Sequence, residues 1–432
     1  MGNVKNGRRA VVVAGARTPF VKAFSEYIEL DAIALGVLAT RALLKKVDLP
    51  YREVEGIVWG GVILPSGAPN VGREIALDLR LDPGCEAYTV TRACASGLQA
   101  VTLGAAAIER GEADILICGG ADSTSNAEVK LPQKLVHAFA PLALGKPTPA
   151  DYLSAAPKLL PLTELIPRQP KVAERSTGEV MGESAERMAR RNEIPREAQD
   201  AFALRSHQRA AAAIASGRFE DEVFPVQGAG GKWVHTDTLV RADSTMEKLA
   251  KLRPAFAREG TLTAGNSSAL TDGSAAVLLM SEEKARALGY KPLAAFASWA
   301  YTGVDPSDQL LMGPALAMPK ALARAGLRLA DIDLVDMHEA FAAQVLSVLK
   351  MLASPAFARS RLGLDEAVGE VDPERLNVHG GSIALGHPFG ATGARMVTTM
   401  ANELARTQKK TALLGICAAG GLGAAAVLER ID

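Results

Sequence analysis

The chain has 432 residues, which is enough for two or three domains, and its 48 basic and 48 acidic side chains give a formal net charge of zero. This balance provides no global electrostatic reason to expect nucleic acid or an anionic membrane as a partner. Four cysteines without a CxxC pair argue against a disulfide framework and a structural zinc site, and they indicate a reducing compartment, which we take to be the cytoplasm.

The first ten residues, MGNVKNGRRA, are short and basic and lead directly into the apolar run VVVAGA, which predicts a strand. They contain no apolar signal-peptide core and are too short for a transit peptide. Asn6 stands where a myristoylation motif requires serine or threonine, so we expect no lipid anchor.

Cys94 lies in the stretch TRACASGLQA, where an alanine-rich helical run begins. A cysteine among apolar residues is often an inert core side chain, and we interpret Cys85 and Cys118 in that way. At a helix N-terminus, however, unpaired backbone N–H groups and the positive end of the helix dipole favour the thiolate over the thiol. Cys94 is therefore a candidate nucleophile.

The composition shifts to Pro, Lys and Arg between about residues 126 and 260, with amphipathic helical stretches such as RSHQRAAAAIASGRF. This region predicts a loop domain inserted into the first half of the chain, and residues 135–170 are expected to be its least regular part. We interpret His137, His207 and His235 as structural residues.

Three stretches of the second half carry further candidate residues. DMHEAFAAQ places His338 and Glu339 directly after an apolar strand, at the edge where parallel α/β sheets build their sites. HGGSIALGHPFGATGAR, residues 379–395, holds His387 in a glycine-rich loop before a helix, and GICAAGGLGAA holds Cys417 at the end of an apolar strand. No HExxH motif and no paired Cys/His spacing predicts a metal site.

The stretch of residues 411–428 is uncharged and long enough to suggest a membrane span. Four glycines interrupt it, and it is rich in Ala and Gly rather than Leu. We therefore predict two buried strands joined by a tight glycine turn, and a soluble protein.

Two pairs of passages indicate an internal duplication. The sequence from Ala95 matches the sequence from Ala391, and the sequence from Leu38 matches the sequence from Leu316, each as a helix, a turn and a strand. Strands that alternate with helices in both halves predict mostly parallel sheets covered by helices. The duplication would bring Cys94, His338, His387 and Cys417 toward one central crevice.

These motifs resemble those of the thiolase family over essentially the whole chain, most closely the β-subunit type of 3-ketoacyl-CoA thiolase from fatty-acid oxidation trifunctional complexes. RACASGLQA resembles the nucleophile motif, HEAFA the Asn-Glu-Ala-Phe block, GGSIALGHPFGATG the catalytic-histidine block, and CAAGGLGAA the second-cysteine block. The resemblance implies an α/β thiolase fold with two duplicated halves in five layers. It implies an N-terminal half over residues 1–290, which includes the loop domain of about 126–260, and a C-terminal half over 291–432.

The resemblance also implies the roles of the candidate residues. Cys94 would be the acyl-thioester nucleophile, His387 the general base, and Cys417 the general acid and base. His338, which replaces the family's usual Asn, would hold a water of one oxyanion hole, and the backbone N–H groups of Cys94 and Ala419 would form another. Ser268, in TAGNSSALTDGSAA, and Met181, in MGESAE, fall on positions that line the coenzyme A pocket. Ala419 stands where this block usually has Gly.

The activity implied by the resemblance is CoA-dependent cleavage of 3-ketoacyl-CoA in fatty-acid β-oxidation, with coenzyme A as a substrate and no bound metal or redox cofactor. A biosynthetic acetoacetyl-CoA thiolase is the nearest alternative, because it runs the same chemistry in reverse. Cys417 argues against a ketoacyl synthase, and a catalytically silent lipid carrier or scaffold on the same fold is a further alternative.

The resemblance implies several partners besides acyl-CoA and coenzyme A. Thiolases form dimers or tetramers, and a β-subunit of this type works with an α-subunit that carries hydratase and 3-hydroxyacyl-CoA dehydrogenase activities. We expect the Pro-rich region from Leu131 to Pro170 to contribute to that contact or to a membrane surface.

Overall fold

The computed structural model describes residues 7–129, 131–161 and 173–431. The basic start of the chain with Asn6, and residues 162–170 of the Pro-rich region, lie outside the described residues. The chain divides into two compact units, one of Met1–Asn126 with Glu174–Asp432 and one of Ala127–Ala173. The domain boundaries expected from the sequence stay a prediction.

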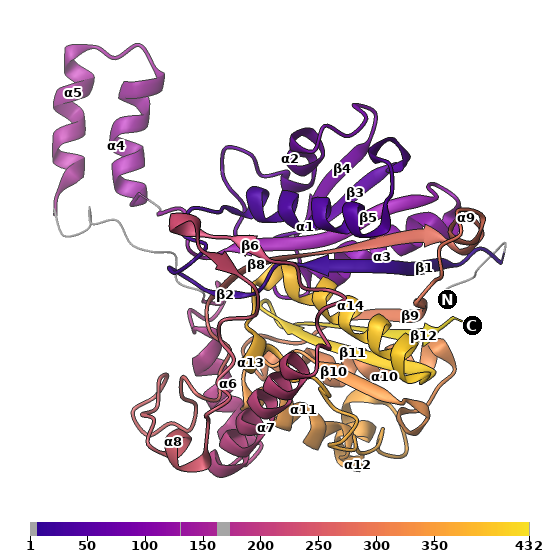
Figure 1. The fold of residues 1–432 in the computed structure, drawn as a ribbon. Helices are drawn as coiled ribbons and strands as arrows, with labels where there is room; N and C mark the ends of the chain where they lie inside the picture. Colours follow the sequence, from indigo (N-terminus) through magenta and orange to yellow (C-terminus); the bar gives the residue numbers. More distant parts are fainter. Residues whose placement is uncertain (1–6, 130, 162–172, 432) are drawn as a thin grey trace. The chain divides into compact units, whose positions relative to one another are not determined.

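The first half of the large unit is built on six strands and four helices (Figure 1). Its elements are β1 (Ala10–Arg17), β2 (Val21–Lys22), α1 (Ala32–Val47), β3 (Gly56–Gly60), α2 (Val71–Asp78), β4 (Glu86–Val90), α3 (Ser96–Arg110), β5 (Ile115–Ser123), β8 (Thr271–Ser281) and α9 (Glu282–Ala287). All residues of β8 are buried, as expected for a central strand with helices on both faces.

The second half repeats this pattern. Its elements are β9 (Ala294–Gly303), α10 (Gly313–Ala325), β10 (Leu334–Met337), α11 (Ala342–Leu352), α12 (Pro355–Phe357), α13 (Ser382–Leu385), α14 (Phe389–Thr407), β11 (Thr411–Ala418) and β12 (Leu422–Arg430). The predicted repeat is confirmed, because α3 and β5 correspond to α14 and β11, and α1 and β3 correspond to α10 and β10. The two strands predicted over residues 411–428 are β11 and β12, joined by a turn with Gly420 and Gly421 at positive φ.

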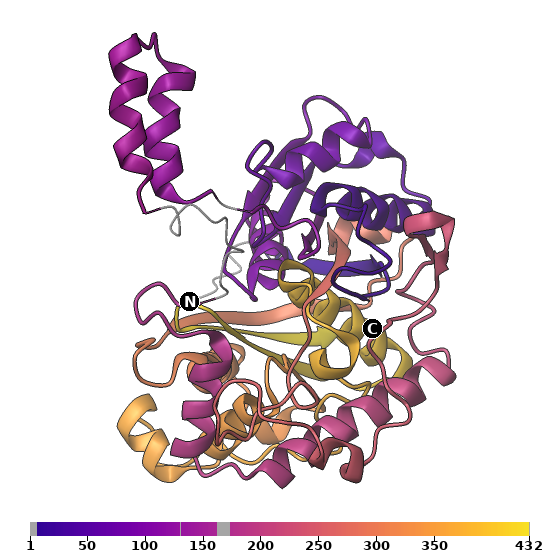
Figure 2. The same cartoon turned by 90° about the vertical axis from the view of Figure 1, so that its left-hand side faces the viewer.

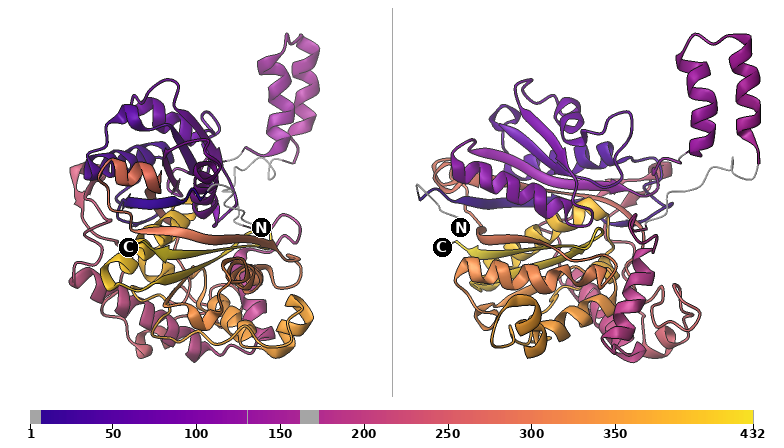
Figure 3. Two further views of the ribbon diagram at one scale, coloured as in Figure 1. Left: turned by 90° about the vertical axis from the view of Figure 1, so that its right-hand side faces the viewer. Right: turned by 180° about the vertical axis from the view of Figure 1, so that it is seen from behind.

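The strands form one sheet in the order β10-β11-β12-β9-β1-β8-β5-β3-β4. The two half-sheets meet where β1 pairs with β9, through Val11 with Ala295 and Val12 with Ala294. Figure 2 shows α14, in yellow, between the two halves, and α3 packs beside it against β3 and β5. Helices α1 and α10 cover the outer faces, as Figure 3 shows for α10 in orange, so the five layers expected from the sequence are present.

The expectation of mostly parallel sheets is wrong. Only β3 with β4, β3 with β5, and β10 with β11 pair in parallel, whereas the remaining neighbours in this sheet are antiparallel. The reason lies in the connections: β12 returns directly from β11 through a glycine turn, and a hairpin return forces antiparallel pairing. Each half therefore combines a parallel helix-crossover unit with antiparallel strands.

The segment between β5 and β8 contains α4 (Gln133–Leu144), α5 (Pro149–Ala155), α6 (Met181–Arg191), α7 (Arg196–Ala215), β6 (Val226–Gln227), β7 (Trp233–Val234) and α8 (Met246–Ala250). The prediction that residues 135–170 are irregular is wrong for the part that the structure describes, since α4 and α5 lie there. Helix α4 contains Pro141 in its last turn. Among the described residues, no helix is long and apolar enough to cross a membrane.

Candidate active site

Cys94 lies on a tight turn between β4 and α3. Ala93 before it has φ +45°, a left-handed conformation that is unfavourable for a residue with a side chain. Ser96 stabilises the turn: its hydroxyl oxygen accepts from the backbone N–H of Arg92 at 2.7 Å and the hydroxyl donates to the carbonyl of Ala93 at 2.6 Å. The turn places the sulfur just ahead of the first residue of α3, Ser96.

Glycines bring the starts of α3 and α14 into backbone contact. A Cβ atom on Gly97 would lie 2.2 Å from the carbonyl oxygen of Gly390, and one on Gly393 would lie 2.2 Å from the backbone nitrogen of Leu98. No side chain fits between these helices, so the glycine that follows Ala95-Ser96 in one repeat and Ala391-Thr392 in the other is a packing requirement of the two central helices. The contact between the two helices places the loop with His387 next to Cys94.

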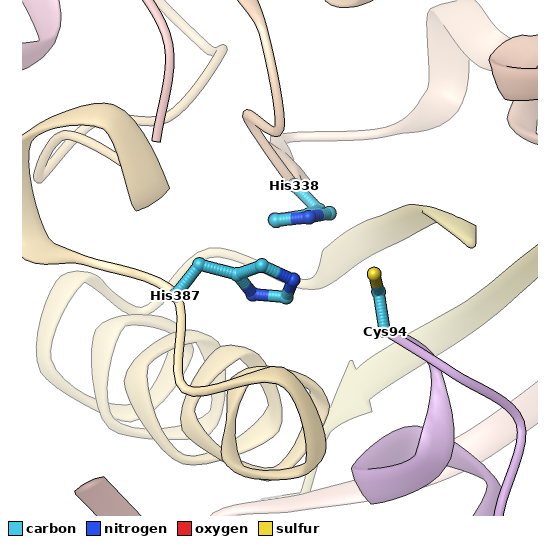
Figure 4. Close-up of side chains that lie close together, drawn as sticks. All are labelled: Cys94, His338 and His387. Carbon is cyan, nitrogen blue, oxygen red and sulfur yellow. The ribbon is translucent and has the colours of Figure 1, made fainter. Parts of the chain in front are cut away.

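Three of the predicted site residues meet at this point. The Cys94 sulfur and a ring nitrogen from each of His338 and His387 lie within 4.8 Å of one another (Figure 4). The two imidazole rings have centroids 4.0 Å apart and are tilted by 39°. The site therefore combines a thiol from the first half of the chain with two imidazoles from the second half.

Each imidazole is oriented by a hydroxyl group. Nδ1 of His387 lies 2.6 Å from Oγ1 of Thr392, and Nδ1 of His338 lies 2.8 Å from Oγ of Ser382. Nε2 of both rings is buried and has no hydrogen-bond partner within the described part of the chain. When Nδ1–H donates to the hydroxyl oxygen, Nε2 keeps its lone pair, so both rings can present an unprotonated nitrogen to the site.

Cys417 lies at the end of β11, fully buried, and near enough to Cys94 that a charge on one thiol disfavours a charge on the other. The backbone N–H groups of Ala419 and Cys94 interact with the Cys94 sulfur. These are the two N–H groups that the sequence assigned to an oxyanion hole.

Burial keeps the reactive groups neutral in the free protein. It raises the pKa of the Cys94 thiol to about 11, although two backbone N–H groups favour the thiolate, and raises the pKa of Cys417 well above its ordinary value. Burial, with Arg395 nearby, lowers the pKa of His387 to about 3 and that of His338 well below its usual range. The backbone N–H groups favour the Cys94 thiolate, as expected for a helix start, but desolvation outweighs them.

Glu339 connects the loop that carries His338 to the loop that carries His387. Its buried carboxylate accepts from the amide of Asn377 at 2.6 Å, the hydroxyl of Ser206 at 2.7 Å and the backbone N–H of Ile383 at 3.1 Å. Burial raises the pKa of Glu339, and these three donors oppose that effect. No role of Glu339 was predicted, and only the folded chain shows that it joins three separate segments.

The two residues expected to bind coenzyme A, Ser268 and Met181, are not part of the group of Cys94, His338 and His387. The backbone N–H of Ser268 donates to the carbonyl of Ala340 at 3.0 Å, in the segment that pairs Ser267 with Phe341 and Leu270 with His387. Met181 is the first residue of α6 and packs against the hydrophobic core of the second half.

A cavity of about 150 Å³ lies beside this segment and was not recognised in the sequence. Its lining includes Ser267 and Ile383 and, among its polar side chains, His207, Arg241 and Lys248. His207, which we had interpreted as structural, accepts from the backbone N–H of Arg241 at 3.2 Å. Single basic residues in a charged helical region carry no spacing signal, so this cluster is visible only after folding.

Comparisons with known proteins agree with this geometry. The family model "Thiolase, N-terminal domain" matches residues 10–283, and "Thiolase, C-terminal domain" matches residues 290–430. A 3-ketoacyl-CoA thiolase of Aliivibrio fischeri is 46% identical over 429 residues, which cover 98% of this chain and 96% of that protein. A 3-ketoacyl-CoA thiolase of Yersinia pestis is 47% identical over 434 residues, which cover 98% of both chains.

Solved structures show the same similarity. A Bacillus anthracis acetyl-CoA acetyltransferase superposes with a TM-score of 0.83 at 33% identity and covers 98% of this chain and 99% of its own. Human mitochondrial 3-ketoacyl-CoA thiolase in complex with CoA superposes with a TM-score of 0.82 at 31% identity, over 98% of both chains.

Proposed function

This chain belongs to the thiolase family and is an acyltransferase, and we propose that it cleaves 3-ketoacyl-CoA with free coenzyme A, giving acetyl-CoA and a shortened acyl-CoA in fatty-acid β-oxidation. The observation that carries this proposal is the meeting of Cys94 with His338 and His387, whose buried Nε2 atoms have no hydrogen-bond partner among the described residues. A soft sulfur nucleophile beside an unprotonated base is the arrangement that attack on a keto carbon requires.

Acylation begins with proton transfer from the Cys94 thiol to Nε2 of His387. The sulfur attacks the keto carbon of the substrate, and the bond between the second and third carbons then breaks. The acyl group stays on Cys94, and the electron pair of the broken bond remains on the acetyl-CoA enolate. Because both partners begin neutral, the thiolate forms only with substrate in place.

The enolate is stabilised and then protonated. His387, and a water held by His338, donate toward the enolate oxygen. Cys417 transfers its thiol proton to the carbanion carbon and releases acetyl-CoA. The N–H groups of Cys94 and Ala419 form the oxyanion hole for the tetrahedral intermediates on the thioester carbon, and both already face the Cys94 sulfur.

Deacylation uses free coenzyme A. Its thiol gives a proton to the Cys417 thiolate, and its sulfur attacks the acyl-Cys94 thioester. Cys94 leaves as a thiolate and recovers the proton held by His387. Protons and electrons therefore balance over the cycle without a redox cofactor or a metal, and coenzyme A acts as a substrate.

The coenzyme A chain runs past Ser268 and Met181 in this proposal. The cavity that Ser267 and Arg241 line lies next to Ser268 in the sequence, and the Arg241 guanidinium suits a phosphate of the coenzyme. Lys248 in this cavity is paired with Asp243 at 2.6 Å, and burial lowers the pKa of His207 to about 4, so that His207 is neutral. The human relative solved in complex with CoA supports binding of this ligand by the fold.

A direct experiment tests the proposed reaction. The protein is incubated with acetoacetyl-CoA or longer 3-ketoacyl-CoA and free coenzyme A, and acetyl-CoA release is measured. Without free coenzyme A, we expect an acyl adduct on the Cys94 peptide by mass spectrometry, and none in Cys94→Ala. A protein that binds acyl-CoA but neither releases acetyl-CoA nor forms this adduct would be a silent carrier on the thiolase fold.

A second candidate is biosynthetic acetoacetyl-CoA condensation, which is favoured by the similarity to an acetyl-CoA acetyltransferase. The two assignments differ in the acyl chain length of the preferred substrate. Under our proposal, kcat/KM for thiolysis is higher with longer 3-ketoacyl-CoA than with acetoacetyl-CoA. Strict preference for acetoacetyl-CoA would favour the biosynthetic assignment.

We further propose that the protein works in the cytoplasm as a homodimer or tetramer, together with a subunit that carries hydratase and 3-hydroxyacyl-CoA dehydrogenase activities. Its four cysteines are free thiols, which suits a reducing compartment. The helical segment of residues 131–161 supports a partner contact, because Leu144, Tyr152 and Leu153 are exposed there.

A further inference from the structure

The centre formed by Cys94, His338 and His387 also has the composition of a metal site. Both Nε2 atoms are buried without a hydrogen-bond partner, with residue exposures of 0% for His338 and 4% for His387. Both histidines belong, with Cys94, to a group in which one donor atom of each residue lies within 4.8 Å of the other two (Figure 4). One sulfur and two imidazoles are therefore close enough to share one ion.

This donor set matches the chemistry of zinc. Zn²⁺ binds thiolate sulfur at about 2.3 Å and imidazole nitrogen at about 2.0–2.1 Å in tetrahedral sites, often with three protein ligands and one open position. Those lengths place neighbouring donors about 3.3–3.6 Å apart, so the three atoms need to close by no more than about 1.5 Å. Rotation of three side chains about their own bonds covers such a distance.

The surroundings of the two histidines also match those of metal ligands. A histidine that binds a metal usually donates its other ring N–H to an oxygen, which fixes the ring and its tautomer. Ser382 and Thr392 supply that oxygen for His338 and His387, at 2.8 Å and 2.6 Å. The sequence shows no zinc motif because the ligands come from three distant positions in the chain.

We propose that the free enzyme binds one Zn²⁺ ion through Cys94 Sγ and the Nε2 atoms of His338 and His387, and that this ion is a reversible inhibitor. Binding exchanges the thiol proton for the metal: Cys94–SH and Zn²⁺ give Cys94–S–Zn and a released proton, with no change in oxidation state. The ion occupies the nucleophile and the base together, so acylation stops until a chelator removes it. Inhibition rests on the proposed thiolase function, whereas metal binding does not.

His338 is the residue that makes this site. With the family's more usual Asn at this position, the centre would offer one thiolate, one imidazole and a weakly coordinating amide oxygen. Zinc is held by sulfur and nitrogen donors in preference to a neutral amide. We therefore expect sensitivity to zinc to depend on His338.

Co²⁺ is the probe for binding, because tetrahedral Co²⁺ with a thiolate ligand absorbs in the near ultraviolet and the visible and needs no enzyme assay. Metal-free full-length protein is titrated with Co²⁺ and then with Zn²⁺. We expect one Co²⁺ per chain with a sulfur-to-cobalt band, displaced by Zn²⁺. The sulfur-to-cobalt band should be absent in Cys94→Ser. The affinity for Co²⁺ should fall at least ~100-fold in His338→Asn and about 10–100-fold in Ser382→Ala.

Cys85→Ser is the matched control, since it removes a thiol outside this centre and should leave the band and its affinity unchanged. Circular dichroism of each variant separates lost ligation from lost folding. Cobalt absorption that persists in Cys94→Ser, or affinity equal to wild type in both Cys94→Ser and His338→Asn, would overturn the proposal.

The inhibitory role is tested separately. Zn²⁺ should inhibit thiolysis at the concentrations at which it displaces Co²⁺, and a chelator should restore the rate. Prior acylation of Cys94 with acetyl-CoA should prevent Co²⁺ binding, since the acylated sulfur is no thiolate. Binding without inhibition would overturn the regulatory role. A protein that lacks thiolase activity but shows the cobalt band would leave the metal site standing and overturn only the proposed function.

Discussion

Cys94 and His387 face each other as a thiol and an unprotonated imidazole, because the same burial raises the pKa of one and lowers that of the other. A neutral pair costs less to bury than an ion pair and keeps the nucleophile inactive without substrate. Part of the Cys94 surface remains accessible, so a substrate can reach a sulfur whose negative charge is poorly solvated.

This protonation state can be tested with iodoacetamide, which reacts with the thiolate only. With a thiol pKa of about 11, the thiolate fraction rises about tenfold for each pH unit between pH 7 and pH 9. We expect alkylation of Cys94 to follow that slope without a plateau below pH 10, measured on the Cys94 peptide by mass spectrometry. A rate that is constant from pH 6 to pH 9 would instead indicate a preformed thiolate–imidazolium pair.

The roles of Cys94 and Cys417 can be distinguished by comparing thiolysis with coenzyme A exchange. Exchange of labelled coenzyme A into a saturated acyl-CoA needs the nucleophile and base but no change in a carbon–carbon bond. Removing a general acid costs on the order of 10²–10⁴ in rate. Cys417→Ala should lose thiolysis by about that factor and keep most of the exchange, whereas Cys94→Ala should lose both and His387→Ala should impair both. Equal loss of both reactions in a folded Cys417→Ala protein would contradict a dedicated proton carrier.

At the scale of elements, the reactive centre depends on the contact between α3 and α14. Their first turns touch through Gly97, Gly390 and Gly393, with no space for a side chain. The contact joins the two halves of the chain where Cys94 and His387 must meet. Displacing one helix therefore displaces one reactant relative to the other.

Gly97→Ala tests this dependence. The added methyl group meets the carbonyl oxygen of Gly390 at 2.2 Å, so the helices must separate. We expect the free energy of unfolding to fall by about 1–3 kcal/mol. We also expect kcat to fall on the order of 10²-fold, the usual cost of misplacing reacting groups by about an ångström. Thermal unfolding and steady-state kinetics measure the two effects.

Gly67→Ala is the control for this substitution, because a Cβ atom there meets nothing within 4 Å. Its stability and kcat should equal those of the wild type. If Gly97→Ala keeps wild-type kcat, the helix contact does not set the distance between the two reactants.

At the scale of the whole molecule, residues 131–161 are expected to be dispensable for folding, because Ala127–Ala173 forms a compact unit of its own. A variant in which a short Gly-Ser linker replaces residues 131–161 should unfold within a few degrees of the full chain. It should lose association with a purified hydratase/dehydrogenase subunit in analytical ultracentrifugation. If the variant still associates with that subunit, residues 131–161 are not part of the partner interface. If the variant instead loses only its co-sedimentation with anionic vesicles, the segment binds a membrane surface.

The sequence was sufficient for the duplicated architecture and for the residues that meet at its centre, because the repeats of 95–120 in 391–416 and of 38–61 in 316–339 fix which helices and strands correspond. The direction of the strands could not be predicted from the sequence, because whether β8 and β12 run antiparallel to their neighbours depends on long-range pairing. The protonation of Cys94 could not be predicted either, because desolvation comes from segments distant in sequence. The linking role of Glu339 and the basic cavity needed the folded chain for the same reason.

The division of the reactive centre between the two halves has a consequence for biosynthesis. A ribosome that has released Cys94 must still translate more than three hundred residues before Cys417, the last of the four groups, leaves the exit tunnel. Until His387 has followed, the nascent chain holds a nucleophile without its base or its acid, so it cannot consume acyl-CoA. The complete set of reactive groups thus arrives only with the second half of the chain, and chains that terminate before His338 cannot carry out thiolysis.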